Sequence, residues 1–158
     1  MATNDPGFRG GHPRSTATIG GHPIHPMLIP FPIVCFILTF ILDLINSRGD
    51  PGVAEASTWM LGFGLIMAAL AAVTGLTDYL GDERVRRLGD ALKHMLANVT
   101  AVVLEVVNFV LRLNDPDSIG STGVYISGVV VLILLYSGWK GGELVYKHGV
   151  GVHDTAHR

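Results

Sequence analysis

The feature that most constrains this chain is a set of long apolar segments. A transmembrane helix needs about 20 mostly apolar residues, because the hydrocarbon core is roughly 30 Å thick and a helix rises about 1.5 Å per residue. Polar stretches that contain glycine or proline separate the apolar segments from one another. The sequence therefore predicts membrane-spanning helices over residues Pro26–Ile45, Thr58–Leu80, Leu92–Leu113 and Val124–Tyr146.

Composition agrees with a membrane protein. Apolar residues make up 49% of the 158-residue chain and charged residues only 15%, whereas about a quarter of the residues of a soluble domain are charged. A soluble bundle would need a polar stripe on each helix, and runs such as IVCFILTFILDLI leave no room for one. The segments are also too long and too uniformly apolar for barrel strands. We expect an all-α integral membrane four-helix bundle with up-down-up-down topology, formed by residues 22–152 between a flexible polar N-terminal tail (1–21) and a C-terminal tail (153–158).

Several local signals suggest where these helices begin and break. Ser57 or Thr58, and Asp90, are expected as N-caps of the second and third helices. The prolines of the stretch HPIHP are expected to hold both of its histidines in extended backbone. The pair Gly141 and Gly142 is expected to interrupt the last helix.

The distribution of lysine and arginine predicts the orientation in the membrane. With four spans, both termini and the loop between spans two and three lie on one face. That face would carry eight basic residues and the other face only two, a bias that marks the cytoplasmic side. The eight are Arg9, Arg14, Arg84, Arg86, Arg87, Lys93, Lys147 and Arg158, against Arg48 and Arg112. We therefore predict a multi-pass protein of the bacterial inner membrane with both termini in the cytoplasm.

The same topology gathers histidines at the terminal end of the bundle. Imidazole is the commonest metal ligand in proteins and an axial ligand of haem, and ligands from separate helices can hold a cofactor inside a bundle. The sequence predicts a haem b or a transition metal ion there, with His22, His25, His94 and His148 as cofactor-binding residues and His25, Asp78, His94 and His148 as metal ligands. The alternative is that these histidines only form hydrogen bonds near the membrane interface.

The third span carries a polar stripe. His94, Asn98, Glu105 and Asn108 follow one another at helical spacing and share one face. Glu105 falls near the bilayer midplane, where a charged side chain must point inward, pair or stay protonated, and Lys140 is its expected partner. The stripe is interpreted either as a proton path or as hydrogen bonds between packed helices. The expected supporting residues around the cofactor are Tyr79, Asn98, Glu105, Lys140 and Glu143.

Four motifs carry a resemblance to a known family. They are GHPIHPMLIPFPI near the first span, GLTDYL at the end of the second, KHMLANV in the third, and GGELVYKHGVGV at the end of the fourth. In this order they resemble the bacterial four-span membrane proteins called domain of unknown function 2231. The resemblance implies the topology, and it places motif histidines at His22, His25, His94 and His148 and the acidic position at Asp78. Some relatives are joined to Rieske or cytochrome modules, which associates the family with redox proteins.

Two functional hypotheses follow from the sequence. The first is an electron-transfer or redox-associated membrane protein with a histidine-lined cofactor site. The alternative is a cofactor-free scaffold or accessory subunit of a redox complex, and a transporter is a weaker third. The expected partners are the lipid bilayer and a membrane redox protein, with a homo-oligomer left open. No basic stretch favours nucleic acid, and no serine, cysteine or paired-carboxylate arrangement assigns an enzymatic reaction.

Overall fold

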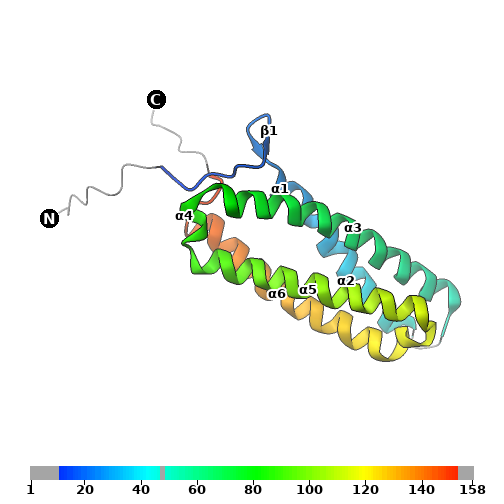
Figure 1. The fold of residues 1–158 in the computed structure, drawn as a ribbon. Coiled ribbons are helices and arrows are strands. Elements are labelled where there is room, and N and C mark those ends of the chain that lie inside the picture. The colour runs from blue at the N-terminus through cyan, green and yellow to red at the C-terminus, as the bar shows by residue number, and fades with distance from the viewer. Residues whose placement is uncertain (1–10, 47–48, 153–158) are drawn as a thin grey trace.

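The computed structural model describes residues 11–46 and 49–152, and the chain in these ranges is almost entirely helical (Figure 1). Residues 1–10 of the predicted N-terminal tail and the whole predicted C-terminal tail, 153–158, lie outside the described residues. A two-stranded antiparallel hairpin precedes the helices. The elements are β1 (Thr18–Ile19), β2 (His22–Pro23), α1 (Ile24–Leu28), α2 (Pro30–Ile45), α3 (Pro51–Gly81), α4 (Glu83–Arg86), α5 (Gly89–Asn114), the 3-10 helix η2 (Pro116–Ser118), the π-helix η3 (Ile119–Gly123) and α6 (Val124–Tyr146).

The predicted all-α membrane bundle is confirmed. The described residues contain four helical segments that are long and apolar enough to cross a bilayer, and they run up, down, up and down between two ends of the molecule (Figure 1). Helix α2 packs along α3, and α5 packs along α6, so the chain forms two antiparallel helical hairpins. The hairpins meet where α2 contacts α6 and α3 contacts α5. Both described ends of the chain lie at one end of this bundle.

The second span begins earlier than the sequence signals suggested. Helix α3 starts at Pro51, and the side chain of Asp50 accepts hydrogen bonds from the backbone N–H groups of Gly52 and Val53. The expected caps, Ser57 and Thr58, were therefore wrong. The reason is that an aspartate cap followed by proline at the first helical position satisfies both requirements of a helix start.

Two further local expectations were wrong. Asp90 lies within the first turn of α5 rather than at its N-cap, which is Leu88. Helix α6 runs without interruption through Gly141 and Gly142 to Tyr146. A glycine pair weakens a helix in water, but in lipid each broken backbone hydrogen bond costs several kcal/mol, so the helix continues.

The prolines of HPIHP act differently on the two histidines. His22 lies in strand β2 and is extended as expected, but His25 lies in helix α1, so the expectation for His25 was wrong. Pro26 follows within the first turn of α1, where a missing N–H leaves no helical hydrogen bond unmade. His25 consequently projects from a helix rather than from an extended segment.

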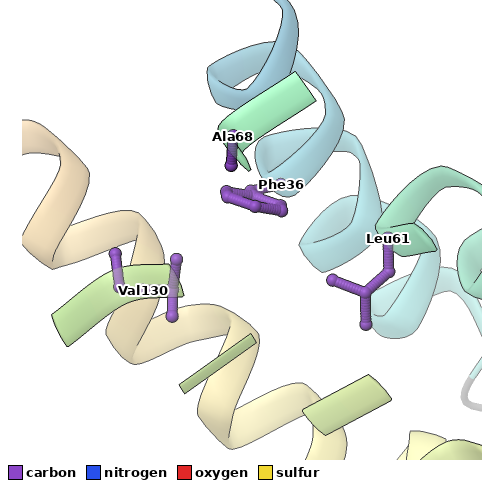
Figure 2. Packing of buried hydrophobic residues seen from close by; sticks show 5 residues of the cluster. Phe36, Leu61, Ala68 and Val130 are labelled. Carbon is purple, nitrogen blue, oxygen red and sulfur yellow. The ribbon is translucent and has the colours of Figure 1, made fainter. Parts of the chain in front are cut away.

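The interior of the bundle is small and apolar at its centre. A cluster of buried side chains joins the two hairpins, and Figure 2 shows that these side chains from α2, α3 and α6 point toward one another. Many large apolar side chains face outward instead, including Leu132 with 66% of its surface exposed. A soluble monomer rarely exposes so much apolar surface, so these outer faces contact the lipid bilayer. The central cluster consists of Phe36, Leu61, Ala68, Ala101 and Val130.

The first span, formed by α1 and α2, and the third span, α5, repeat the same pattern of inward positions. Asp43 of α2 and Arg112 of α5 are 69 residues apart, and His25 and His94 have the same separation. Other buried positions of α2 and α5 follow the same offset. The contacts between the hairpins also correspond, because α2 contacts α6 as α5 contacts α3. The bundle therefore has the form of two parallel repeats related by an axis along the membrane normal. The matching buried pairs are Pro32 with Ala101, Phe36 with Glu105, Thr39 with Asn108, and Asp43 with Arg112.

Candidate functional site

The terminal end of the bundle is covered by residues 11–21, here called the terminal strap. Asp78, in the last turns of α3, holds the strap: its Oδ1 accepts hydrogen bonds from the Ser15 hydroxyl (2.9 Å) and from the backbone N–H groups of Thr16 and Ala17 (2.7 Å each). This part of the predicted tail is thus fixed on the bundle. The carboxylate of Asp78 is committed to the strap rather than to the histidines.

The strap also joins the two described ends of the chain. The backbone N–H of Gly151 donates to the carbonyl of Pro13 at 2.9 Å. The N–H of Arg14 donates to Asp82, whose side chain also pairs with Arg84 at 2.7 Å. The hydrogen bond from the Arg84 side chain is the main reason that the pKa of Asp82 lies far below its ordinary value. The strap, the turn after α3 and the end of the described chain form one connected surface.

His25 lies under this surface with a fixed ring orientation. Its Nδ1 is 2.8 Å from the carbonyl oxygen of Ala71 on α3. Because a carbonyl oxygen can only accept, Nδ1 carries a hydrogen, and Nε2 is the ring nitrogen that can offer a lone pair. Gly75, one turn after Ala71, leaves room for the ring, since a Cβ there would lie 2.8 Å from Cε1 of His25.

His94 of α5 is held in the same way by α6. Its Nδ1 lies 2.9 Å from the carbonyl oxygen of Ser137, and Gly141, one turn later, lies against the ring edge. Nε2 again has the lone pair, and it accepts a hydrogen bond from the side-chain nitrogen of Asn98 at 3.2 Å. That nitrogen also donates to the backbone carbonyl of His94 at 2.9 Å.

The two imidazoles face each other between the hairpins. The centroids of the His25 and His94 rings are 6.4 Å apart, and the ring planes are nearly perpendicular at 87°. His25 comes from α1, which leads into α2, and His94 comes from α5; each ring is anchored by the helix that follows, α3 or α6. The structure thus brings together two of the four histidines that the sequence selected.

The other predicted ligands lie elsewhere. His22 is exposed in β2, and Nε2 of His148 lies 3.0 Å from a carboxylate oxygen of Asp90. Tyr79 is half-buried near the end of α3. Within residues 11–46 and 49–152, no group of three or more histidine, cysteine, aspartate or glutamate side chains is arranged to hold a metal ion. The predicted four-ligand set is therefore not assembled, and the His25–His94 pair remains as the candidate site.

The expected pairing of Glu105 with Lys140 was wrong. The Lys140 ammonium pairs with Asp90 at 3.1 Å and with Glu143 one turn along α6. Lys140 directly precedes Gly141, which lies against His94, so it sits at the level of His94. Glu105 lies about 16 Å farther along α5 at 1.5 Å per residue.

A second polar site, which the sequence reasoning missed, lies at the opposite end of the bundle. We call it the distal polar cluster; it consists of Asp43, Ser57, Asn108, Arg112 and Ser127. At its centre Arg112 and Asp43 form an ion pair at 2.6 Å, with both side chains fully buried. The guanidinium also donates to Ser57, Ser127 and Asn108. Opposite charges near the distal ends of the first and third spans were the signal in the sequence, but Arg112 was counted only among the basic residues that set the orientation.

Glu105 adjoins this cluster rather than the histidines. Its Oε2 accepts a hydrogen bond from the Asn108 side chain at 2.9 Å. Its side chain is completely buried, and Oε1 has no hydrogen-bond partner among the described residues. The polar stripe of α5 is consequently divided, with His94 and Asn98 at one end and Glu105, Asn108 and Arg112 at the other. Ala101 of the apolar centre lies between them.

Comparison with known proteins agrees with this architecture. A sequence family described as "Predicted membrane protein (DUF2231)" matches residues 21–154. The chain belongs to this family. The match includes both imidazoles, the distal polar cluster and all four spans, and it leaves out residues 11–20 of the terminal strap. The resemblance inferred from the motifs is thus confirmed, and no curated protein and no solved structure matches the chain.

Proposed function

We propose that this family member is an electron-transfer protein of the bacterial inner membrane that binds a haem through His25 and His94. The observation that carries the proposal is the anchored pair of imidazoles: each ring gives its Nδ1 hydrogen to a backbone carbonyl and has its lone pair on Nε2, which in His94 accepts a hydrogen bond from the Asn98 amide. Such a hydrogen bond at the other ring nitrogen is the usual support of a metal-bound histidine.

The spacing and number of ligands favour haem over a bare ion. With metal–nitrogen bonds of about 2 Å, two imidazoles on opposite sides of one metal ion have their ring centres roughly 6 Å apart. The centroid separation of 6.4 Å is close to this value. A structural zinc ion takes four ligands, whereas haem iron takes only its axial ligands from the protein. Two histidines therefore suffice for haem but not for such an ion.

The setting of the pair is consistent with electron transfer. Both rings lie near one end of the spans and beneath the terminal strap, where the chain's basic residues gather. On the positive-inside rule this end is cytoplasmic. A haem here would lie near the membrane surface, within reach of a membrane redox partner.

The second candidate is a cofactor-free scaffold or accessory subunit, and a specific observation favours it too. Nearly perpendicular rings with centroids 4.5 to 7 Å apart are also the ordinary geometry of aromatic packing. In that case the contact between the two rings joins the hairpins, and the bonds to Ala71 and Ser137 fix each ring within its own hairpin. The two candidates make opposite predictions for the purified protein.

The deciding experiment is an optical spectrum with metal analysis on protein purified in mild detergent from haem-replete cells. We expect a Soret band and about one iron per chain, and we expect both to be lost in His25→Ala and in His94→Ala. His22→Ala and His148→Ala are the matched controls, because those histidines lie outside the pair, and they should keep the spectrum. Axial ligation by two imidazoles would also give a low-spin spectrum in both redox states.

A colourless, iron-free protein that stays colourless after incubation with haemin would overturn the proposal and favour the scaffold. Iron retained in both pair variants would place the cofactor elsewhere and would overturn it as well. Circular dichroism of each variant verifies that the bundle is still folded when the spectrum is read.

A further inference from the structure

The paired imidazoles do not explain why a carboxyl, that of Glu105, lies in the interior of the bundle. It lies in the middle of the third span, and none of its side chain is exposed. Its counterpart in the first hairpin is Phe36, an apolar residue of the central cluster. A carboxyl thus stands where the repeat has a phenyl ring. Such a residue within a membrane span is expensive to bury and marks a functional position by default.

Arg112, the nearest cation, is already fully used. A guanidinium has five N–H groups. Nε donates to Asn108 (3.0 Å), one terminal nitrogen donates to Asp43 and Ser57 (2.9 and 2.8 Å), and the other donates to Asp43 and Ser127 (2.6 and 3.2 Å). These five bonds leave no N–H for Glu105.

The charges of the cluster balance without Glu105. The groups that act electrostatically on Glu105 are Arg112 from its own helix and Asp43 from α2, and these two form a neutral pair. The cluster residues contributed by α3 and α6, Ser57 and Ser127, are hydroxyls. An ionised Glu105 would therefore add an unpaired negative charge to the membrane interior, which costs several kcal/mol. A protonated Glu105 adds none.

The hydrogen bonds of Glu105 also do not stabilise an anion, because a buried carboxylate is normally held by two or three donors and Glu105 has one. Oε2 of Glu105 accepts from Asn108, while Oε1 is buried with no hydrogen-bond partner among the described residues. Buried polar atoms are nearly always bonded to protein or water. Two more unpartnered buried oxygens occur toward the distal end, on Asn46 and Ser118.

The distal polar cluster lies against a cleft at the distal end of the bundle. A cleft of about 320 Å³ opens between α3 and the segment that follows α5, and Arg112 is part of its lining together with Glu55, Thr58 and Ile119. From Arg112 the hydrogen bonds continue through Asn108 to Glu105. Toward the terminal end, Ala101 and its apolar neighbours separate Glu105 from His94.

We propose that Glu105 is a proton-binding site in the membrane interior, neutral in the resting protein, which exchanges its proton with water from the distal face. Water that enters at the cleft beside Arg112 carries the proton to and from the carboxyl, because neither the guanidinium of Arg112 nor the side-chain amide of Asn108 releases a proton. The proton comes from water and returns to water, so the site needs no other reactant. It does not depend on haem at the imidazole pair.

Infrared spectroscopy of the full-length protein in lipid nanodiscs tests both parts of the proposal. At neutral pH we expect the carbonyl band of a protonated carboxylic acid, which shifts when the protein contains ¹³C-labelled glutamate. Glu105→Gln should abolish the band, and Glu55→Gln, which changes a glutamate in the cleft wall, should leave it. Transfer into D₂O should shift the band in the folded protein.

Absence of the band in wild-type protein at neutral pH would overturn the proposal, because Glu105 would then be ionised. A band that persists in Glu105→Gln, or that D₂O leaves unshifted in the folded protein, would also overturn it. So would a band that sodium ions remove at constant pH, which would indicate a metal-cation site. The glutamate label identifies the band in unmodified protein even if a variant fails to fold.

Discussion

The first span, formed by α1 and α2, and the third span, α5, place side chains at equivalent positions but fill the two ends of the bundle differently. At the terminal end both positions are histidine, His25 and His94, and their rings face each other at 6.4 Å between centroids. At the distal end the equivalent positions are Asp43 and Arg112, which form a buried ion pair. The two repeats thus contribute identical residues at the terminal end and residues of opposite charge at the distal end.

The difference follows from charge. Two neutral imidazoles can meet inside a bundle without repulsion, so the same residue serves in both repeats. Two like charges buried together would repel strongly, so a charged pair between equivalent positions must combine opposite signs. The distal end therefore distinguishes the first hairpin from the second, and the terminal end does not.

The largest effect is expected from breaking the complementary pair. Arg112→Met leaves Asp43 buried without its partner, which costs about 3–5 kcal/mol of unfolding free energy. Thermal unfolding followed by tryptophan fluorescence in detergent measures the loss. Arg87→Met is the control, because Arg87 pairs with Glu83 on the surface, and it should change stability by less than about 1 kcal/mol.

Exchanging the two charges sharpens the comparison. If the positions are equivalent, the double variant Asp43→Arg with Arg112→Asp should recover part of the stability lost in Arg112→Met. A double variant that is less stable than Arg112→Met would contradict equivalence. The result would then mean that the hydrogen bonds of Ser57 and Ser127 require aspartate in the first hairpin and arginine in the second.

The glycines beside the two imidazoles give a smaller and graded effect. A Cβ at Gly75 would lie 2.8 Å from His25, and one at Gly141 would lie 3.1 Å from His94. Gly75→Ala should therefore cost about 1–3 kcal/mol of stability, with Gly141→Ala nearer the lower limit. Gly138→Ala is the control, because a Cβ at Gly138 would meet nothing within 4 Å, and it should be neutral or stabilising. The reverse order of Gly75 and Gly141, measured by thermal unfolding, would show that α6 holds its ring more tightly than α3.

The smallest effect concerns a feature that only the first hairpin has. Asp78→Ala removes the acceptor for Ser15, Thr16 and Ala17 and should reduce stability by about 1 kcal/mol. The strap should then be cut faster by trypsin after Arg14, as intact mass measures. Asp117→Ala, at the opposite end, is the control, and equal cleavage in the two variants would show that Asp78 does not hold the strap.

The sequence predicted the spans well because lipid imposes a simple rule on length and polarity. The bounds of α6 were predicted to the residue, and His25 and His94 were correctly placed at one end. The start of α3 was missed because the Asp50–Pro51 cap lies a full two turns before the strongly apolar stretch. Lys140 was wrongly expected at the depth of Glu105, because its depth was counted along the sequence from the end of the fourth span. The way α5 and α6 pack places it beside Asp90 instead.

The distal polar cluster could not be assembled from spacing alone. Asp43 stands in an apolar run and Arg112 near a predicted loop, and only the fold shows that both are buried and in contact. The 69-residue offset was present in the sequence, but apart from His25 and His94 the equivalent buried positions carry different residues. When matched positions hold different residue types, comparison of sequence motifs does not detect the repeat.

The buried ion pair also imposes an order on biogenesis. The ribosome makes Asp43 well before Arg112, so the first hairpin reaches the bilayer while its carboxylate has no counter-ion. Until the second hairpin arrives, Asp43 must wait at the water boundary or take up a proton. Once the pair has formed, separating the two hairpins would leave an unpaired charge in the hydrocarbon core, so the two hairpins fold as a single cooperative unit.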